Sequence, residues 1–146
     1  MALDINSLET SFDAIAPRGE ELVEDFYSRL FTAAPSLRDL FPNDMTRQRT
    51  MLLAALVLLR KSLCDLDRIA PTLRSLGARH VGYGALPEHY PIVGRLLIES
   101  MEHVAGDGWR PQYATAWADA YAAVAAEMMA GAEQATEQEF DERRAA

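Results

Sequence analysis

Prolines set the strongest constraint on how this chain can fold, because five of the seven fall at or near the start of an apolar-periodic stretch. Pro91 lies within the first turn of its stretch, where backbone amides have no partner inside a helix. Four others open their stretches, where a residue without an N–H costs a helix nothing: Pro17, Pro35, Pro71 and Pro111. No stretch alternates cleanly with β-branched residues, and no Asn-Gly or Asp-Gly turn joins two such stretches. The pattern predicts an all-α fold.

Apolar spacing places the expected helices along the chain. They cover residues 4–15, 17–33, 45–63, 71–81, 88–105 and 110–133, with a short helical turn at 35–40. Asp44 is expected to cap the 45–63 helix, and Gly82 with Gly84 to end the 71–81 helix. The segment 134–146 is polar and is expected to be a fraying end of the last helix. Since domains have roughly 100–200 residues, we expect one domain over residues 1–146.

Charge and composition exclude several classes of function. The chain has 14 Lys and Arg residues against 22 Asp and Glu, and the net charge of −8 argues against nucleic acid or an anionic membrane surface as a partner. Cys64 is the only cysteine and cannot form an internal disulfide, and the N-terminus shows no secretory signal. The longest apolar run, Met51 to Leu59, is far shorter than the roughly 20 residues that span a bilayer. We therefore expect a cytoplasmic protein.

Two predicted helices carry a polar residue on an otherwise apolar face. In the 45–63 helix, the run 51–59 is apolar all round, which predicts burial on more than one side. Gln48 precedes this run and shares a face with Leu52. In the 71–81 helix, His80 shares a face with Leu76. Local spacing leaves both open: His80 fits a core residue or a ligand, and Gln48 fits a site residue or the last solvated residue before burial.

Catalytic templates are missing from the sequence. It contains no GxSxG, P-loop, GxGxxG or HExxH motif. A nucleophilic pair of Cys64 and His80 would need a third, orienting group, and none can be placed. Tyr27 fits a core ring whose hydroxyl needs a partner, and Phe41 fits ordinary packing. Taken singly, these residues identify no function.

Five short segments together match the order and spacing of one known family. They are FYSRLF at 26–31, LRDLFP at 37–42, LGARHVGYG at 76–84, HYPIVG at 89–94 and AWADAY at 116–121. From about residue 5 to 130, without large gaps, the chain resembles the single-domain bacterial haemoglobins, which are similar to the globin half of flavohaemoglobins. The resemblance implies a globin fold of seven to eight helices around a haem pocket, with haem b as the cofactor.

The resemblance also implies roles for the matching residues. His80 is implied as the metal ligand, which binds the haem iron through a ring nitrogen. Tyr27 and Gln48 are implied as the catalytic residues on the opposite side of the haem. The other implied haem-binding residues form walls, stack on the macrocycle, lie beside the histidine or meet a propionate: Phe41, Met51, Leu52, Leu76, Arg79, Tyr90 and Val93. Arg79 equally fits a solvated arginine.

Tyr27 and Gln48 give the implied oxygen chemistry a physical basis. Ferrous iron passes electron density to O₂, and a phenol O–H and an amide N–H can both donate to the resulting negative charge. Each such hydrogen bond contributes roughly 1.5–3 kcal/mol, and CO gains less. The resemblance thus implies reversible O₂ binding that supports nitric oxide dioxygenation, the conversion of NO and O₂ to nitrate.

Two features depart from the flavohaemoglobin pattern. An ungapped count from Trp117 places Ala132 where that family has a proximal glutamate, and Glu133 follows about 100° further around the helix. Glu133 is therefore expected to reach His80 only where the helix shifts or bulges. The 146 residues also contain no FAD or NAD(P) domain. The expected partners are thus O₂, NO and CO as ligands and an external reductase as electron donor.

Other classes of function stay open at the level of sequence. The same residues suit an O₂ storage or transport protein without enzymatic turnover. A haem-based gas sensor or a haem-free globin-like interaction module would need a partner surface. The chain fits a monomer or a homodimer equally well.

Overall fold

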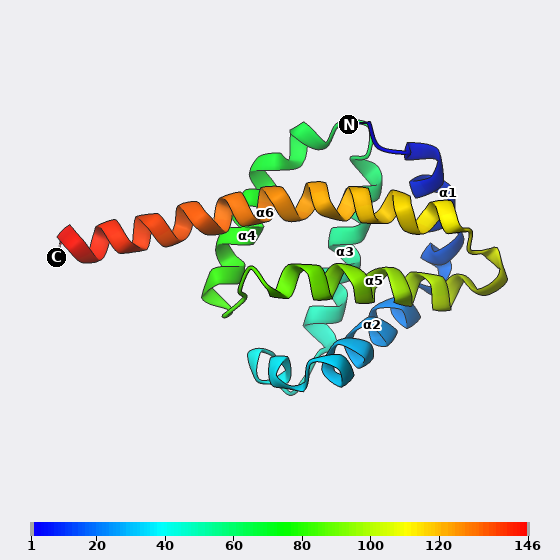
Figure 1. Cartoon of the computed structure of the whole chain (residues 1–146). Helices are drawn as coiled ribbons and strands as arrows, with labels where there is room; N and C mark the ends of the chain where they lie inside the picture. Colours follow the sequence, from blue (N-terminus) through cyan, green and yellow to red (C-terminus); the bar gives the residue numbers. More distant parts are fainter. Residues whose placement is uncertain (1, 146) are drawn as a thin grey trace.

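The computed structural model describes residues 2–145, and all regular structure in that range is helical (Figure 1). The α-helices are α1 Ile5–Ile15, α2 Gly19–Ala33, α3 Thr46–Lys61, α4 Ala70–Gly82, α5 His89–Ala105 and α6 Pro111–Ala145. Four 3₁₀ helices join them: η1 Ala16–Arg18, η2 Pro35–Leu40, η3 Leu66–Ile69 and η4 Gly106–Gly108. The all-α prediction is confirmed. The described residues hold six α-helices instead of seven to eight, because the remaining segments are short enough to close only i→i+3 turns.

Local signals account for most helix ends. Pro111 is the first residue of α6, and Pro71 lies in the first turn of α4. Pro17 instead lies in η1, and α2 begins at Gly19. Asp44 does not occupy the capping position of α3, which is Met45, because the helix begins one residue later than predicted. The Oδ1 atom of Asp44 still accepts from the Thr46 backbone N at 3.0 Å and from its hydroxyl at 2.7 Å. These contacts satisfy a free amide at the start of α3.

The last helix differs from the prediction for the C-terminal segment. The helix α6 continues unbroken to Ala145, so residues 134–145 are helical instead of forming a frayed end, and residue 146 lies outside the described residues. Figure 1 shows this end of α6 extending beyond the other helices. Its side chains are almost all exposed, which explains why a buried stripe did not predict it. None of the described helices is long and apolar enough to cross a membrane.

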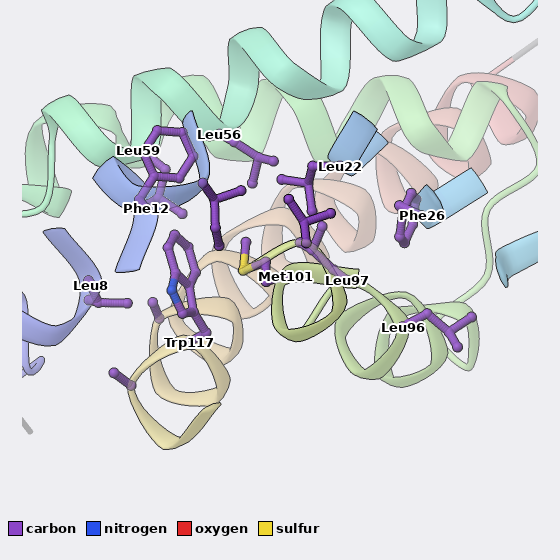
Figure 2. Close-up of a cluster of buried hydrophobic side chains, with 14 of the residues drawn as sticks. Leu8, Phe12, Leu22, Phe26, Leu56, Leu59, Leu96, Leu97, Met101 and Trp117 are labelled. Carbon is purple, nitrogen blue, oxygen red and sulfur yellow. The ribbon is translucent and has the colours of Figure 1, made fainter. Parts of the chain in front are cut away.

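The main core lies where α1, α2, α3, α5 and α6 meet (Figure 2). Trp117 of α6 is nearly fully buried and lies 6.2 Å from the ring of Phe12. Its indole N–H donates to the Ser11 hydroxyl at 2.8 Å, and that hydroxyl donates to the Ser7 carbonyl at 2.7 Å. The buried indole therefore has a partner for its one polar atom. No residue of α4 belongs to this cluster among the described residues.

The apolar run of α3 is less buried than its sequence predicts. Leu56 and Leu59 are buried, but Met51 is 43% and Leu58 is 40% exposed. The helix lies against α2, whereas α4 packs along α6. Burial of α3 on more than one side is therefore wrong for the protein chain by itself. Met51 and Leu58 are seven residues apart, so they lie on the same, partly uncovered side of α3.

Candidate functional site

His80 lies in the last turn of α4 with one ring nitrogen already engaged. Its Nδ1 atom is 2.7 Å from the Leu76 carbonyl, one turn earlier in the helix. A carbonyl oxygen can only accept, so Nδ1 carries the proton and donates. The Nε2 atom then keeps its lone pair, which is the form of histidine that binds a metal ion. The ring is half-buried and lies 5.5 Å from the Tyr83 ring, edge to face.

Gln48, in the first turn of α3, carries a buried oxygen without a partner. Its Oε1 atom is inaccessible to solvent and accepts no hydrogen bond among the described residues. The Tyr27 hydroxyl, from α2, lies 3.5 Å from the Gln48 backbone carbonyl, at the long limit for a hydrogen bond. Burial raises the pKa of Tyr27 to about 12, so its phenol stays protonated at neutral pH. Tyr27 therefore places a phenol donor beside the backbone of Gln48.

Aromatic packing holds the ring of Tyr27. The ring lies 5.0 Å from Phe26, 6.0 Å from Phe31 and 5.7 Å from Phe41. Phe41 follows η2, and its carbonyl accepts from the Arg38 guanidinium at 3.2 Å. The predicted pair Tyr27 and Phe41 is thus brought into contact from two separate elements. These rings shield the Tyr27 hydroxyl from water on the α2 side.

Tyr90, at the start of α5, has a second buried polar atom without a partner. Its side chain is 9% exposed, and its hydroxyl makes no hydrogen bond within residues 2–145. Burial raises the pKa of Tyr90. The hydroxyl of Tyr121 donates to the Tyr90 carbonyl at 2.6 Å, and a Cβ at Gly94 would lie 2.5 Å from the Tyr121 ring. Gly94 is therefore needed for this contact, which joins the HYPIVG and AWADAY segments.

The other predicted haem-binding residues have unequal burial. Leu52 and Val93 are half-buried and pack on the main core. Leu76, on α4, is half-buried. Met51, on α3, is exposed. Arg79 is exposed and forms no ion pair with any described residue. Of these residues, Leu52, Leu76 and Val93 are thus partly covered by the protein, whereas Met51 and Arg79 are exposed.

Glu133 stays exposed on a continuous helix. The helix α6 has no bulge at this position, and Gly131 is the buried residue that contacts α4 at Arg74. Because Glu133 lies about 200° around the helix from Gly131, it does not share the face that contacts α4. The shift in α6 that would bring Glu133 to His80 is absent. Of the tyrosine and glutamate expected near this histidine, Tyr90 is buried and Glu133 is exposed.

Two hollows in the surface lie away from these residues. One of about 310 Å³ lies between α2 and α5, where Arg29 and Arg95 both face Glu99, at 4.0 and 3.8 Å. The other, of about 580 Å³, lies between α2 and α3 and includes Val23 and Leu53. Neither is lined by Tyr27, Gln48 or His80. The candidate site is therefore defined by the polar atoms of Tyr27, Gln48 and His80 and not by either hollow.

The donor set suits a haem group. In the described residues no three His, Cys, Asp or Glu side chains converge as a metal cluster, and a haem iron takes four of its ligands from the porphyrin and needs one from the protein. His80 supplies a free Nε2 atom. Gln48 and Tyr90 supply buried polar atoms that still lack partners, which native proteins rarely leave. The fold is all-α, and it carries a half-buried histidine whose chemistry fits a haem-type cofactor.

The chain belongs to the globin family. The family model described as Globin matches residues 24–128, which include the predicted site residues from Tyr27 to Val93. Membership of this family implies a haem cofactor and small gas molecules as ligands. The predicted globin fold is confirmed by this match and by solved structures.

Curated relatives are similar to this chain over most of its length. The chain is 32% identical to a flavohemoprotein of Bacillus subtilis over 124 residues, which are 83% of this chain and 31% of that protein. It is 33% identical to a flavohemoprotein of Deinococcus radiodurans over 130 residues, 87% of this chain and 32% of that protein. The chain thus spans about a third of the length of these relatives.

Two solved structures share the fold at lower sequence identity. A bacterial globin from Campylobacter jejuni has a TM-score of 0.81 at 22% identity, covering 91% of this chain and 96% of its own. An engineered carbene transferase derived from a proposed nitric oxide dioxygenase of Rhodothermus marinus has a TM-score of 0.84 at 22% identity, covering 94% and 97%.

Some contributing residues were not singled out from the sequence. Gly77 and Gly131, where α4 crosses α6, and Gly94, under Tyr121, allow the close contacts around the site. A glycine inside a predicted helix is a signal that could have marked them, because it costs about 1 kcal/mol relative to alanine. What each glycine approaches is a non-local contact, which the sequence pattern does not give.

Proposed function

We propose that this chain binds haem b between α3 and α4 with His80 as the iron ligand, binds O₂ reversibly, and supports nitric oxide dioxygenation. One observation carries the proposal: the Nδ1 atom of His80 donates to Leu76 and leaves Nε2 free, on a helix that packs along α6 while α3 lies against α2. The unpartnered Oε1 atom of Gln48 adds a polar group on the α3 side.

The cofactor would supply an iron centre that binds diatomic gases and exchanges one electron. The protein's own side chains then decide how a gas ligand is treated. Tyr27 and Gln48 would donate hydrogen bonds to O₂, which takes up more negative charge than CO does when bound. Burial keeps the Tyr27 hydroxyl protonated for this role. Leu52 and Phe41, packed on the core, exclude water from this side. On the other side, the Leu76 carbonyl orients the His80 ring.

The remaining predicted residues complete the proposed pocket. Met51, Leu76 and Val93 form its walls, and Arg79, exposed and without an ion pair in the described chain, binds a haem propionate. Covering Met51 with haem would remove one of the large exposed apolar side chains of the structure. Tyr90 contributes its buried hydroxyl on the His80 side.

Nitric oxide dioxygenation needs an electron from outside this chain. One NO, one O₂ and one electron give one nitrate ion, so each turnover leaves the iron oxidised and requires its reduction. Similarity to flavohemoproteins and to a carbene transferase derived from a proposed nitric oxide dioxygenase supports this activity. We propose that a separate reductase in the cytoplasm supplies the electron. Without such a partner, the same residues would serve O₂ storage or transport.

Absorbance spectra of the haem-loaded protein test the proposal. We expect a Soret band that shifts on reduction and again with CO, and that is weakened in His80→Gly and restored by added imidazole. His103→Gly is the matched control, because His103 is exposed on α5. A wild-type spectrum that does not respond to reduction or CO would reject haem binding. Nitrate formation from NO and O₂ with a general flavin reductase then separates the dioxygenase from a protein that only binds O₂.

A further inference from the structure

The helix that carries His80 is attached to the molecule differently from the other helices. Its buried residues are Leu73 and Gly77, and no α4 side chain is part of the main core in residues 2–145. The helix α4 packs against α6, and Figure 1 shows α4 passing behind α6. The position of His80 is therefore set by how α4 lies on α6.

Two glycines form a reciprocal contact at this crossing. A Cβ added at Gly77 would overlap the Met128 carbonyl oxygen, and one added at Gly131 would overlap the Arg74 carbonyl oxygen. Both neighbours are backbone atoms, so no side chain can turn aside to make room. The two helices run antiparallel here, because the step from Arg74 to Gly77 on α4 is matched by the step from Gly131 back to Met128 on α6.

The close approach of the two helices explains why each of these glycines faces the backbone of the other helix. Each costs its helix about 1 kcal/mol relative to alanine when nothing is gained in return. With no Cβ, each Cα–H can lie against a carbonyl of the other helix, a weak hydrogen bond seen at close helix crossings. An ion pair between Arg74 Nε and Glu127 Oε2, at 2.8 Å, flanks the crossing. The contact brings α4 closer to α6 than any larger residue would allow.

We propose that the close crossing of α4 and α6, which Gly77 allows against Met128 and Gly131 allows against Arg74, positions His80 for its iron. This inference rests on the proposed function, since it assigns no role without haem. Gly77 lies one turn before His80 and directly after Leu76, whose carbonyl holds the ring. Moving α4 away from α6 moves the ring and the carbonyl that orients it together. Because α3 packs on α2, drawing α4 toward α6 sets the width available between His80 and Gln48.

Alanine at either glycine wedges the helices apart and should alter the bond between histidine and iron. The added Cβ needs about 1.5 Å or more of extra separation to reach ordinary contact with a carbonyl oxygen. Gly77→Ala and Gly131→Ala should both shift the iron–histidine stretching band of the ferrous protein in the same direction, measured by resonance Raman spectroscopy. Both should speed haem transfer to excess apomyoglobin about tenfold, equal to about 1.4 kcal/mol.

Gly82→Ala is the matched control for these variants. Gly82 lies in α4 two residues after His80, and a Cβ there would meet nothing within 4 Å. It should leave both the band and the rate of haem loss as in wild type. In the double variant at Gly77 and Gly131, the rate of haem loss should rise by less than the product of the two single fold-increases. One added Cβ already separates the helices and so makes room for the other.

The experiment separates this inference from the proposed function. An iron–histidine band in Gly77→Ala and Gly131→Ala identical to that of wild type, with helix content retained by circular dichroism, overturns the positioning role alone. A double variant in which the two fold-increases in the rate of haem loss simply multiply overturns it as well. A wild-type protein without an iron–histidine band overturns the proposed function and this inference with it. If Gly77→Ala does not fold, Gly131→Ala gives the same test one turn further from His80.

Discussion

Replacing Tyr27 by phenylalanine removes one hydroxyl and leaves its surroundings in place. The ring is held by Phe26, Phe31 and Phe41 at centroid distances of 5.0, 6.0 and 5.7 Å, and phenylalanine fills the same space. The hydroxyl itself has only a 3.5 Å contact with the Gln48 carbonyl. A hydrogen bond that long contributes little, so we expect a loss of stability of about 0.5 kcal/mol or less.

The effect on O₂ should be much larger than the effect on stability. Burial raises the pKa of Tyr27 to about 12, so the hydroxyl is a donor throughout the physiological range. A hydrogen bond to a partly charged acceptor contributes roughly 1.5–3 kcal/mol, which corresponds to O₂ release about 10- to 150-fold faster in Tyr27→Phe. CO release should change much less, because CO carries less charge when bound.

Stopped-flow displacement of O₂ by CO measures this rate in the haem-loaded protein. Tyr113→Phe is the matched control, because Tyr113 is buried in α6 beside Trp109 and lies outside the site. Unchanged O₂ release in Tyr27→Phe would refute the assignment of Tyr27 as a donor. An equal acceleration in Tyr113→Phe would show that the effect comes from general loosening of the fold.

Three further predictions concern stability and follow from contacts in the structure. Gly94→Ala places a Cβ 2.5 Å from the Tyr121 ring and should cost about 1–3 kcal/mol, with urea unfolding as the measurement and a wild-type midpoint as the contradicting result. Trp117→Phe removes the bond to Ser11 and part of the core and should cost about 2 kcal/mol, lowering Tm by roughly 4–8 °C in calorimetry; an unchanged Tm would contradict it. Because the folded pKa of Tyr27 is raised to about 12 whereas the unfolded chain ionises it near pH 10, Tyr27 does not change stability below about pH 10 and lowers it as pH rises toward 12. Between these pH values the unfolding free energy of wild type should fall by about 2–3 kcal/mol more than that of Tyr27→Phe, and parallel curves for the two proteins would refute the burial of this hydroxyl.

Much of the fold follows from local signals. Apolar spacing and the positions of proline and glycine predict the helices to within a few residues, as at Pro111 for α6 and Gly82 for α4. These signals act within one or two turns, so they need no knowledge of the rest of the chain. The exception is the end of α6, where exposed residues form a helix without an apolar stripe to mark it.

Only part of the candidate site could be predicted from the sequence. Motif order nominated His80, Gln48 and Tyr27, but local spacing left a core packing role open for His80 and Tyr27 and a solvated position open for Gln48. The structure shows that the Nδ1 atom of His80 is engaged and that Oε1 of Gln48 is buried without a partner. It also leaves Glu133 exposed, which a count of residues could not decide.

The sequence by itself determined the all-α class and the helix positions, because periodicity and capping depend on neighbours along the chain. Its resemblance to a known family nominated the candidate ligand, His80. Only the tertiary structure decided what covers each apolar face. It leaves Met51 and Leu58 of α3 exposed and places Gly77 against the backbone of α6. Helical periodicity shows which side of a helix is apolar, whereas the partner of that side is set by long-range packing that no local pattern encodes.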